Sequence, residues 1–282
     1  MMKPRYAYVT VLLGGSGRYL PGVIALQRSL RASGAKYPLM VGTAFCSDDV
    51  ISVLDELSIL HFDLFEINPP SCVRELNNAG EFCRWNQSFT KLGILGITHL
   101  DKVVLLDSDM AILSNLDSLF DCKSMSAVIA GKGFHPEWVD LNSGLMVIEP
   151  STELFGRAMN ILNNVTPNDL IGKTGLGDQD ILKLLIHDWP TNNSLHLGEE
   201  YNAFQDALSQ YDRTGYLRYG LVKVVHFELG PRKPWEYKLS DWFGVVRRCV
   251  RFGSFAEIKA LMFYRRLLPS RHFVHGCCGI HD

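Results

Sequence analysis

Residues 102–109 read KVVLLDSD, a nearly all-apolar run that ends in two aspartates. A short apolar run of this kind is typical of a strand buried on both faces, as in a parallel sheet. Asp107 and Asp109 are two residues apart, so their side chains point to the same side where the strand ends. Ligands bind parallel sheets outside the carboxyl ends of the strands, and carboxylates suit a hard divalent cation such as Mn²⁺ or Mg²⁺. The stretch predicts a metal site, with a pair of solvated turn acids as the alternative.

Strands and helices alternate along the chain before this stretch. Apolar runs predict strands, and apolar residues at helical spacing predict helices. The strands are expected at 6–13, 38–43 and 64–67, and the helices at 20–32, 48–57 and 89–97. After residue 107 we expect short strands at 127–130, 144–148 and 223–225, and a helix at 179–186. This order predicts an α/β fold with a mainly parallel sheet and helices on both faces.

The 282 residues are expected to form one domain with a C-terminal appendage. Residues 1–240 contain no repeat or clear linker, whereas residues 241–282 carry seven Lys or Arg against three acids. We expect this basic segment to form a pair of helices that packs over the core with its arginines in water. An anionic membrane surface, or another subunit as in a homodimer, is the alternative for such an amphipathic segment.

The composition of the chain indicates its cellular compartment and the kinds of partner it can bind. The formal net charge of −2 gives no case for a nucleic-acid partner. The opening MMKPRYAYVTVLLGG lacks the pattern of a signal peptide, and no apolar stretch approaches the roughly 18 residues that span a membrane. Seven cysteines are an odd number, and most are scattered, which favours reduced thiols. We therefore expect a cytoplasmic protein.

A histidine and a glycine-lysine turn follow the expected strand near residue 225. His226 ends the run VKVVHF and is either a metal ligand or a packed core histidine. Gly230 and Lys233 follow within GPRKPW. A glycine lets backbone approach a phosphate closely, and a lysine supplies a point charge for it. The alternative is an ordinary surface turn.

Two further polar groups precede expected elements. Asn142 and Ser143 stand before Gly144, where an amide and a hydroxyl can bind sugar or ribose hydroxyls or simply form a turn. Asp178 and Gln179 stand at an expected helix start, where an aspartate also serves as the N-cap. None of these groups decides a function alone.

Taken together and in order, these pieces resemble the retaining glycosyltransferase family that contains glycogenin and plant galactinol synthase, glycosyltransferase family 8. The resemblance covers roughly residues 6–237 and is more specific than any one motif. The matching blocks are AYVT (7–10), GVIAL (22–26), YPL (37–39), TKL (90–92), LDSD (106–109), NLDSLF (115–120), NSG (142–144), GDQ (177–179), YN (201–202), KVVHF (223–227) and KPW (233–235). The family implies a single nucleotide-sugar transferase domain of the GT-A type.

The resemblance also implies a role for each matched position. Asp107, Asp109 and His226 would hold Mn²⁺, or Mg²⁺ in its place, against the diphosphate of a UDP-sugar donor. The uracil and ribose of the donor would contact Val11, Leu13, Tyr19 and Ser108, and Arg84 and Lys91 would reach the donor from the helix before the metal strand. The transferred sugar would lie among Asn142, Ser143, Asp178 and Gln179. Gly230 and Lys233 would hold the diphosphate. Asp178, Gln179 and Lys233 are the expected catalytic residues.

The implied reaction moves glucose or galactose from UDP to an acceptor hydroxyl with retention of configuration. The acceptor would be a polyol, a small sugar or a protein-linked glycan, and nothing in the sequence chooses among them or between the two sugars. The main alternative is a catalytically inactive sugar-nucleotide-binding protein. A nicotinamide oxidoreductase is suggested by GGSG (14–17), but the dinucleotide fingerprint needs a further glycine where residue 20 is leucine.

The sequence departs from glycogenin in three places. Residue 175 is glycine where glycogenin has an acid. The acceptor-tyrosine segment of glycogenin has no convincing counterpart in residues 204–220, although Tyr211, Tyr216 and Tyr219 lie there. One extra residue separates His226 from Lys233, which puts the shape of the phosphate loop in doubt.

Overall fold

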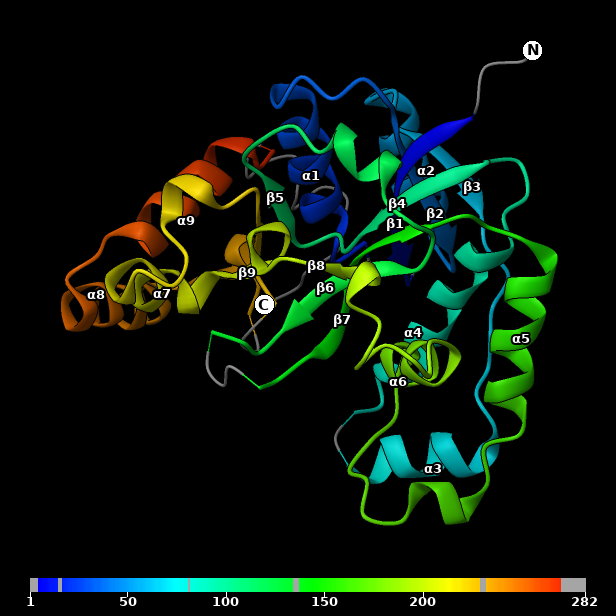
Figure 1. Cartoon of the computed structure of the whole chain (residues 1–282). Coiled ribbons are helices and arrows are strands. Elements are labelled where there is room, and N and C mark those ends of the chain that lie inside the picture. The colour runs from blue at the N-terminus through cyan, green and yellow to red at the C-terminus, as the bar shows by residue number, and fades with distance from the viewer. Residues whose placement is uncertain (1–4, 15–16, 81, 134–136, 229–231, 270–282) are drawn as a thin grey trace.

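The computed structural model describes residues 5–14, 17–80, 82–133, 137–228 and 232–269. Figure 1 shows a central twisted sheet with helices on both of its faces. The last helices of the chain gather at one side of the molecule with α7, and α3 lies at the far end from them. The α/β fold expected from the order of elements is confirmed.

The main sheet has seven strands in the order β3-β2-β1-β4-β7-β6-β8 among the described residues. Its strands are β1 (Tyr6–Leu13), β2 (Leu39–Ala44), β3 (Leu60–Asp63), β4 (Lys102–Leu106), β6 (Ser126–Ala130), β7 (Asp140–Ile148) and β8 (His196–Leu197). Neighbouring strands pair in parallel except where β7 lies between β4 and β6. The sheet is therefore mainly parallel, as expected.

Alternate residues of β4 enter different apolar clusters, which explains why the strand is almost wholly apolar. Val103 and Leu105 lie in the cluster of η1, α5 and α6, whereas Val104 and Leu106 lie in the cluster that includes α1. The helices of this part of the fold are α1 (Leu20–Ala32), α2 (Asp48–Glu56), α3 (Ser71–Ala79), α4 (Trp85–Ser88), the 3₁₀ helix η1 (Phe89–Gly96), α5 (Thr152–Asn163) and α6 (Asp178–Leu185). Burial on both faces leaves only the ends of β4 open to a ligand.

A second, three-stranded sheet brings distant residues to the end of β4. It consists of β5 (Met110–Ile112), β10 (Val224–His226) and β9 (Ala203–Phe204), with β10 in the middle. His226 is opposite Met110 in the antiparallel pair, and the N–H of Phe227 donates to the carbonyl of Asp109 at 3.0 Å. The backbone pairing therefore fixes His226 beside Asp109.

The C-terminal segment forms two helices that pack on this second sheet. They are α8 (Leu239–Phe252) and α9 (Ala256–Leu267), and they share an apolar cluster with α7 (Leu208–Thr214). Leu261 and Tyr264 of α9 are fully buried, and the ring of Tyr264 packs on that of Phe227. The expected helix pair is therefore present. Among the described residues, no helix is long and apolar enough to cross a membrane.

The expected strand at 64–67 is wrong, because the third strand is β3 at Leu60–Asp63. The N–H of Leu64 still donates to the carbonyl of Thr43, but the N–H of Ile67 donates to the hydroxyl of Thr90 instead of to a strand. Leu64 and Ile67 are apolar because their side chains enter the core. Core burial, not strand pairing, produced the apolar signal.

Other elements differ less from expectation. The helix expected at 89–97 is a 3₁₀ helix over Phe89–Gly96, and most other bounds shift by one or two residues. The strand expected at 144–148 starts four residues earlier, at Asp140. Its register against β6 shifts between Ala127 and Val128, whose partners are Met146 and Asn142. The irregularity falls on the NSG motif, next to the end of β4.

Candidate active site and metal centre

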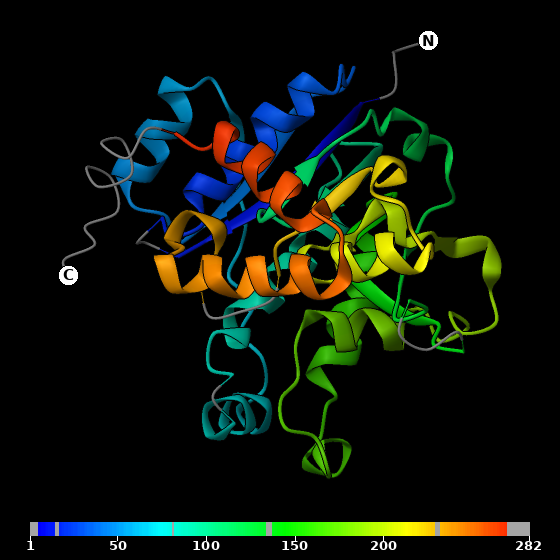
Figure 2. The same cartoon turned by 90° about the vertical axis from the view of Figure 1, so that its left-hand side faces the viewer.

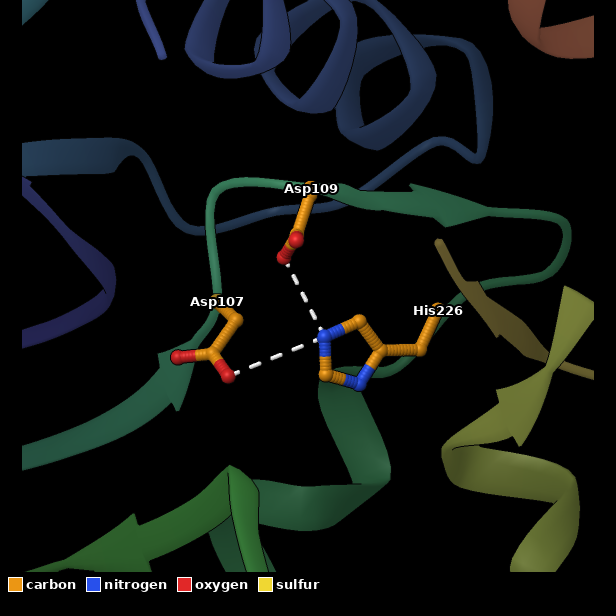
Figure 3. Close-up of side chains that lie close together, drawn as sticks. All are labelled: Asp107, Asp109 and His226. Atoms are coloured by element: carbon orange, nitrogen blue, oxygen red, sulfur yellow. Dashed lines mark hydrogen bonds and ion pairs between the residues drawn. The ribbon is translucent and has the colours of Figure 1, made fainter. Parts of the chain in front are cut away.

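Two aspartates and one histidine converge where β4 ends. One oxygen each of Asp107 and Asp109 and one nitrogen of His226 lie within 4.8 Å of one another. Figure 3 shows the two carboxylates pointing at Nε2 of His226, at 3.8 Å from Asp107 Oδ2 and 3.1 Å from Asp109 Oδ1. Two carboxylates and an imidazole are ligands that a divalent transition metal accepts. The arrangement forms a candidate divalent-cation site.

The orientation of the imidazole fits metal binding. A chain of hydrogen bonds starts at the backbone N–H of Gly144, which donates to Oδ1 of Asn142 at 2.8 Å. The same oxygen accepts from Nδ2 of Asn202 at 2.7 Å, so Oδ1 of Asn202 faces Nδ1 of His226 at 2.8 Å. In the neutral ring Nδ1 therefore carries the proton, and the lone pair of Nε2 is left for a metal, the usual arrangement for a histidine ligand.

Two lysines hold the outer oxygens of the carboxylates. Lys91 Nζ donates to Oδ1 of Asp107 at 2.6 Å, and Lys233 Nζ lies 2.7 Å from Oδ2 of Asp109. The oxygens nearest to His226 are the opposite ones, Oδ2 of Asp107 and Oδ1 of Asp109. One oxygen of each carboxylate is thus held by a lysine, and the other oxygen faces Nε2 of His226.

Burial and charge set the protonation of this centre. Burial alone would raise the pKa of Asp109, but the charges of His226 and Lys233 hold it well below its ordinary value. Burial would lower the pKa of His226, but the neighbouring charge of Asp109 outweighs it and the pKa is raised. Asp109 therefore stays ionised, while the metal-free histidine holds its proton to a higher pH than usual.

Lys91 also connects Asp107 to a second group of polar residues, which consists of Ser143 in β7 and Asp178 and Gln179 at the start of α6. Lys91 Nζ is 3.7 Å from Oδ2 of Asp178 and donates to the carbonyl of Ser143 at 3.0 Å. The side-chain oxygen of Gln179 accepts from the N–H of Ser143 at 2.9 Å. Burial raises the pKa of Asp178, although the charge of Lys91 opposes it. The expected sugar-binding positions therefore adjoin the candidate metal site.

The geometry distinguishes between the alternative roles of two motifs. Asp180, not Asp178, accepts from the N–H of Gly177 at the start of α6, so Asp178 is left to face Lys91. The NSG motif lies within β7 instead of forming a turn before it. A Cβ on Gly144 would lie 3.0 Å from Cε1 of His226 and 2.9 Å from Oδ1 of Asn142. A glycine is needed there because the histidine packs directly on the backbone.

The expected nucleotide-binding residues lie around Tyr19 and the end of β1. Lys233 Nζ is 6.0 Å from the centre of the Tyr19 ring, and the charge of Arg84 acts to lower the pKa of Tyr19, which burial raises. Ser108 is buried, while Val11 and Leu13 are partly buried against the core. Gly230 lies outside the described residues.

Three residues complete the site although the sequence assigned them no role. Asn202 orients His226 through its side-chain oxygen. The ring of Trp235 packs edge-on against Tyr19 at 5.8 Å between centroids. A Cβ on Gly22 would lie 2.5 Å from the carbonyl oxygen of Ser108 and 2.9 Å from the Trp235 ring, so this glycine lets α1 approach the metal loop. All three residues stand in matched blocks, YN, KPW and GVIAL, which was the available signal.

The departures from glycogenin also have structural causes. A Cβ on Gly175 would lie 3.0 Å from the ring of Phe82 and 3.1 Å from that of Trp85, so no acid fits there without movement. The hydroxyls of Tyr211 and Tyr216 both donate to Glu199, at 3.0 and 2.9 Å. Their pKa values are raised, mainly by burial. These two tyrosines therefore bind Glu199, which lies just before β9 of the second sheet.

Comparison with known proteins identifies the family. A family model described as glycosyl transferase family 8 matches residues 10–238. An uncharacterised protein of Acanthamoeba polyphaga mimivirus is 29% identical over 255 residues, 84% of each chain. Human glycogenin-2 is 31% identical over 247 residues, 85% of this chain and 45% of the relative. Inositol phosphorylceramide glucuronosyltransferase 1 of Arabidopsis thaliana is 30% identical over 251 residues, 83% of this chain and 43% of the relative.

The chain therefore spans less than half the length of these last two relatives. Among solved structures, galactosyltransferase LgtC in complex with donor and acceptor sugar analogs superposes with a TM-score of 0.52 at 17% identity. That match covers 87% of this chain and 95% of the other, and it supports the GT-A-like fold alone. The family model covers most of the chain, and the candidate metal site lies at the end of β4. This chain therefore belongs to glycosyl transferase family 8, the retaining glycosyltransferases that use a nucleotide sugar.

Proposed function

We propose that this chain transfers glucose or galactose from a UDP-sugar to an acceptor hydroxyl, with Mn²⁺ as the cofactor or Mg²⁺ in its place. The observation that carries the proposal is the convergence of Asp107 Oδ2, Asp109 Oδ1 and His226 Nε2 on one point. Lys233 also contacts Asp109, through the other carboxylate oxygen. Such a group binds a metal and a phosphate side by side, which is what a nucleotide-sugar donor needs.

The donor diphosphate would lie between the metal ligands and Lys233. When bound, the metal supplies positive charge to the phosphate oxygens. Lys233 is 7% exposed, and its Nζ donates to the carbonyls of Phe227 and Glu228, so it is held in place before the donor arrives. A preorganised cation at the point where negative charge develops stabilises the transition state for the departure of UDP, usually the largest single contribution to catalysis.

The nucleoside would lie toward Tyr19 and the end of β1. Tyr19 offers an aromatic ring close to Lys233, and Val11 and Leu13 offer apolar surface. A ring and apolar side chains suit a flat base, while the adjacent lysine suits the phosphates that follow it. This order, base at Tyr19 and diphosphate at Lys233, directs the sugar toward Lys91 and α6.

The transferred sugar would lie among Asp178, Gln179, Asn142 and Ser143. We propose that the acceptor oxygen attacks the anomeric carbon on the face that UDP leaves. The bond from that carbon to the β-phosphate oxygen breaks, its electron pair stays on the phosphate, and the acceptor proton passes to the same phosphate. Asp178 is the carboxylate nearest to this sugar position, so a covalent glycosyl-Asp178 intermediate is the alternative route.

The acceptor is proposed to be a separate polyol, sugar or glycan. Tyr211 and Tyr216 are engaged by Glu199, so neither offers a free hydroxyl to a donor sugar. Incubation with a UDP-sugar and Mn²⁺ should therefore leave the mass of the intact chain unchanged. A gain of one hexose on either tyrosine would contradict a separate acceptor.

A screen of donor hydrolysis without an acceptor tests the proposal. UDP-glucose and UDP-galactose are compared with UDP-glucuronate, because one relative is named as a glucuronosyltransferase. Stabilisation by UDP with Mn²⁺ but no hydrolysis of any donor would favour an inactive binding protein. Faster hydrolysis of UDP-glucuronate would replace the hexose by a hexuronic acid. Proton NMR of the first glycoside formed should show the α configuration of the donor.

A further inference from the structure

Helix α8 carries an apolar stripe on its outer face. Leu239, Phe243, Val246 and Val250 are 75, 69, 46 and 71% exposed. Their spacings of four, three and four residues place them along one line of an α-helix. The face that packs on the protein is a different one, where Val245 and Cys249 are buried. The helix is thus apolar on two sides, and the protein covers only one of them.

Such a stripe is unusual for a protein surface. Single exposed apolar residues are common, but a contiguous row of large ones marks a surface that contacts something else. Figure 2 shows α8 lying along the outside of the molecule with α9 beside it. The neighbouring α9 adds Phe255 and Met262, which are 60 and 48% exposed.

The charges beside the stripe all have one sign. Arg247 and Arg251 are exposed and follow the stripe around the helix, each one position after a stripe residue. Arg265 and Arg266 are exposed on α9, and the guanidinium of Arg265 lies over the ring of Trp242. Figure 1 places these two helices on the same side of the molecule.

The acids of the helix pair do not balance these arginines. Within α8 and α9 the two acids are Asp241 and Glu257, and both are already paired. Arg232 binds Asp241 through two hydrogen bonds of 2.8 Å, and Arg248 binds the fully buried Glu257. The outer surface therefore combines an apolar row with positive charge that the helix pair leaves uncompensated.

We propose that α8 lies flat on an anionic membrane surface. The stripe Leu239, Phe243, Val246 and Val250 would enter the boundary between lipid headgroups and acyl chains, and Arg247 and Arg251 would contact lipid phosphates. The positive charge argues for an anionic lipid surface over a second copy of this chain, because two such faces would repel each other. This inference does not depend on the proposed donor or acceptor.

Membrane docking would also fix the position of the active site. The helix α8 begins at Leu239, directly after the segment that holds Lys233 and Trp235. The ion pair between Arg232 and Asp241 joins that segment to the first turn of α8. A helix held at the membrane would therefore keep the donor-binding segment close to the lipid surface.

Sedimentation of the full chain with vesicles tests the proposal. Vesicles of phosphatidylcholine alone are compared with vesicles that also contain phosphatidylglycerol, at low and high salt. We expect binding to the anionic vesicles that weakens with salt. The double changes Phe243→Ser/Val250→Ser and Arg247→Gln/Arg251→Gln should each reduce the vesicle affinity by about tenfold or more. All four side chains are exposed, so the fold should survive.

Matched controls separate docking through α8 from a general effect of surface hydrophobicity and from self-association. Phe65→Ser and Ile171→Ser remove apolar side chains elsewhere that are more exposed than Phe243 and Val250, and these variants should bind vesicles as the unmodified chain does. Thermal stabilisation by UDP and Mn²⁺ checks the fold and the donor site of each variant separately. Three results would overturn the proposal: no binding to anionic vesicles, a stripe variant that only converts a dimer to a monomer, or vesicle binding that appears only after residues 270–282 are removed.

Discussion

Nδ1 of His226 lies 2.8 Å from Oδ1 of Asn202, which makes this amide the partner that orients the imidazole of the candidate metal site. Asn202 is 3% exposed and is held in turn by Asn142. Because the backbone N–H of Gly144 fixes Asn142, the orientation of the imidazole is ultimately set by the backbone of β7. Two amide side chains, those of Asn142 and Asn202, therefore connect the candidate metal site to the main sheet.

Replacing Asn202 by alanine should weaken Mn²⁺ binding without removing a metal ligand. Loss of the partner of a metal-bound histidine typically costs about 10–100-fold in metal affinity or activity. The exposed residue Asn163 at the end of α5 supplies the control, as Asn163→Ala should leave the affinity unchanged. Titration of Mn²⁺ by calorimetry measures both variants. An unaltered affinity in Asn202→Ala would show that the amide does not orient His226.

Replacing Asp109 should abolish transfer, and the choice of substitution matters. Asp109 is 6% exposed and is the acid nearest to both Lys233 and His226, so Asp109→Ala removes the main counter-charge of two buried cations. Breaking a buried pair in this way destabilises a protein by about 3–5 kcal/mol. Asp109→Asn keeps the shape and most of the hydrogen bonding. We expect Asp109→Asn to fold, to lose Mn²⁺ binding and to be inactive, whereas near-normal turnover would remove Asp109 from the metal site.

The sequence could predict the positions of Asp107 and Asp109 in this candidate site, but not that His226 would lie beside them. Asp107 and Asp109 end a buried strand, so the side to which they point follows from strand geometry. His226 is 117 residues further on, and only the pairing of β10 with β5 brings it there. Spacing alone left it undecided between a core histidine and a ligand, and the family resemblance supplied the role.

The network behind His226 lay beyond sequence reasoning for the same reason. Asn142 and Asn202 are 60 residues apart, and their contact depends on the irregular register of β7. Helix α1 was predicted to the residue because its apolar periodicity belongs to the helix itself. The third strand was misplaced because Leu64 and Ile67 are buried although they lie beyond the end of β3. Local periodicity was predictable, whereas long-range pairing was not.

Replacing Lys233 should slow transfer by about 10²–10³-fold, the usual loss for one group aimed at developing charge. Its contacts with the carbonyls of Phe227 and Glu228 show that it also organises the loop. Lys233→Arg keeps the charge but cannot reproduce that compact geometry, so it should recover only part of the rate. The rate of UDP-sugar hydrolysis and the Kd of UDP, measured together, separate lost catalysis from lost binding. An unchanged rate in Lys233→Ala would exclude it from the phosphate site.

Manganese binding should depend on pH through His226. Its pKa in the metal-free protein is raised, since the charge of Asp109 outweighs burial. The metal must displace that proton, so affinity should be full above the raised pKa and fall as the pH drops through it, by about tenfold per pH unit. Calorimetry in buffers of different ionisation enthalpy should detect close to one proton released per Mn²⁺. Affinity that stays constant between about pH 6 and 8 would contradict this linkage.

Truncation should distinguish the last twelve residues from the helix pair. The helices α8 and α9 bury Val245, Cys249, Leu261 and Tyr264 in the cluster that also contains Phe227. Burying an apolar side chain of this size contributes about 1.5–3 kcal/mol. Four of them amount to a large part of the roughly 5–15 kcal/mol that stabilises a typical protein.

We therefore expect a chain ending at residue 240 to aggregate, because the apolar surface under α8 and α9 becomes exposed. A chain ending at residue 270 should stay folded and bind UDP with Mn²⁺, since α9 ends at Leu267. Thermal unfolding and size-exclusion chromatography compare the two with the full chain. A soluble, active 1–240 fragment would show that the helix pair is a separate appendage and not part of the core.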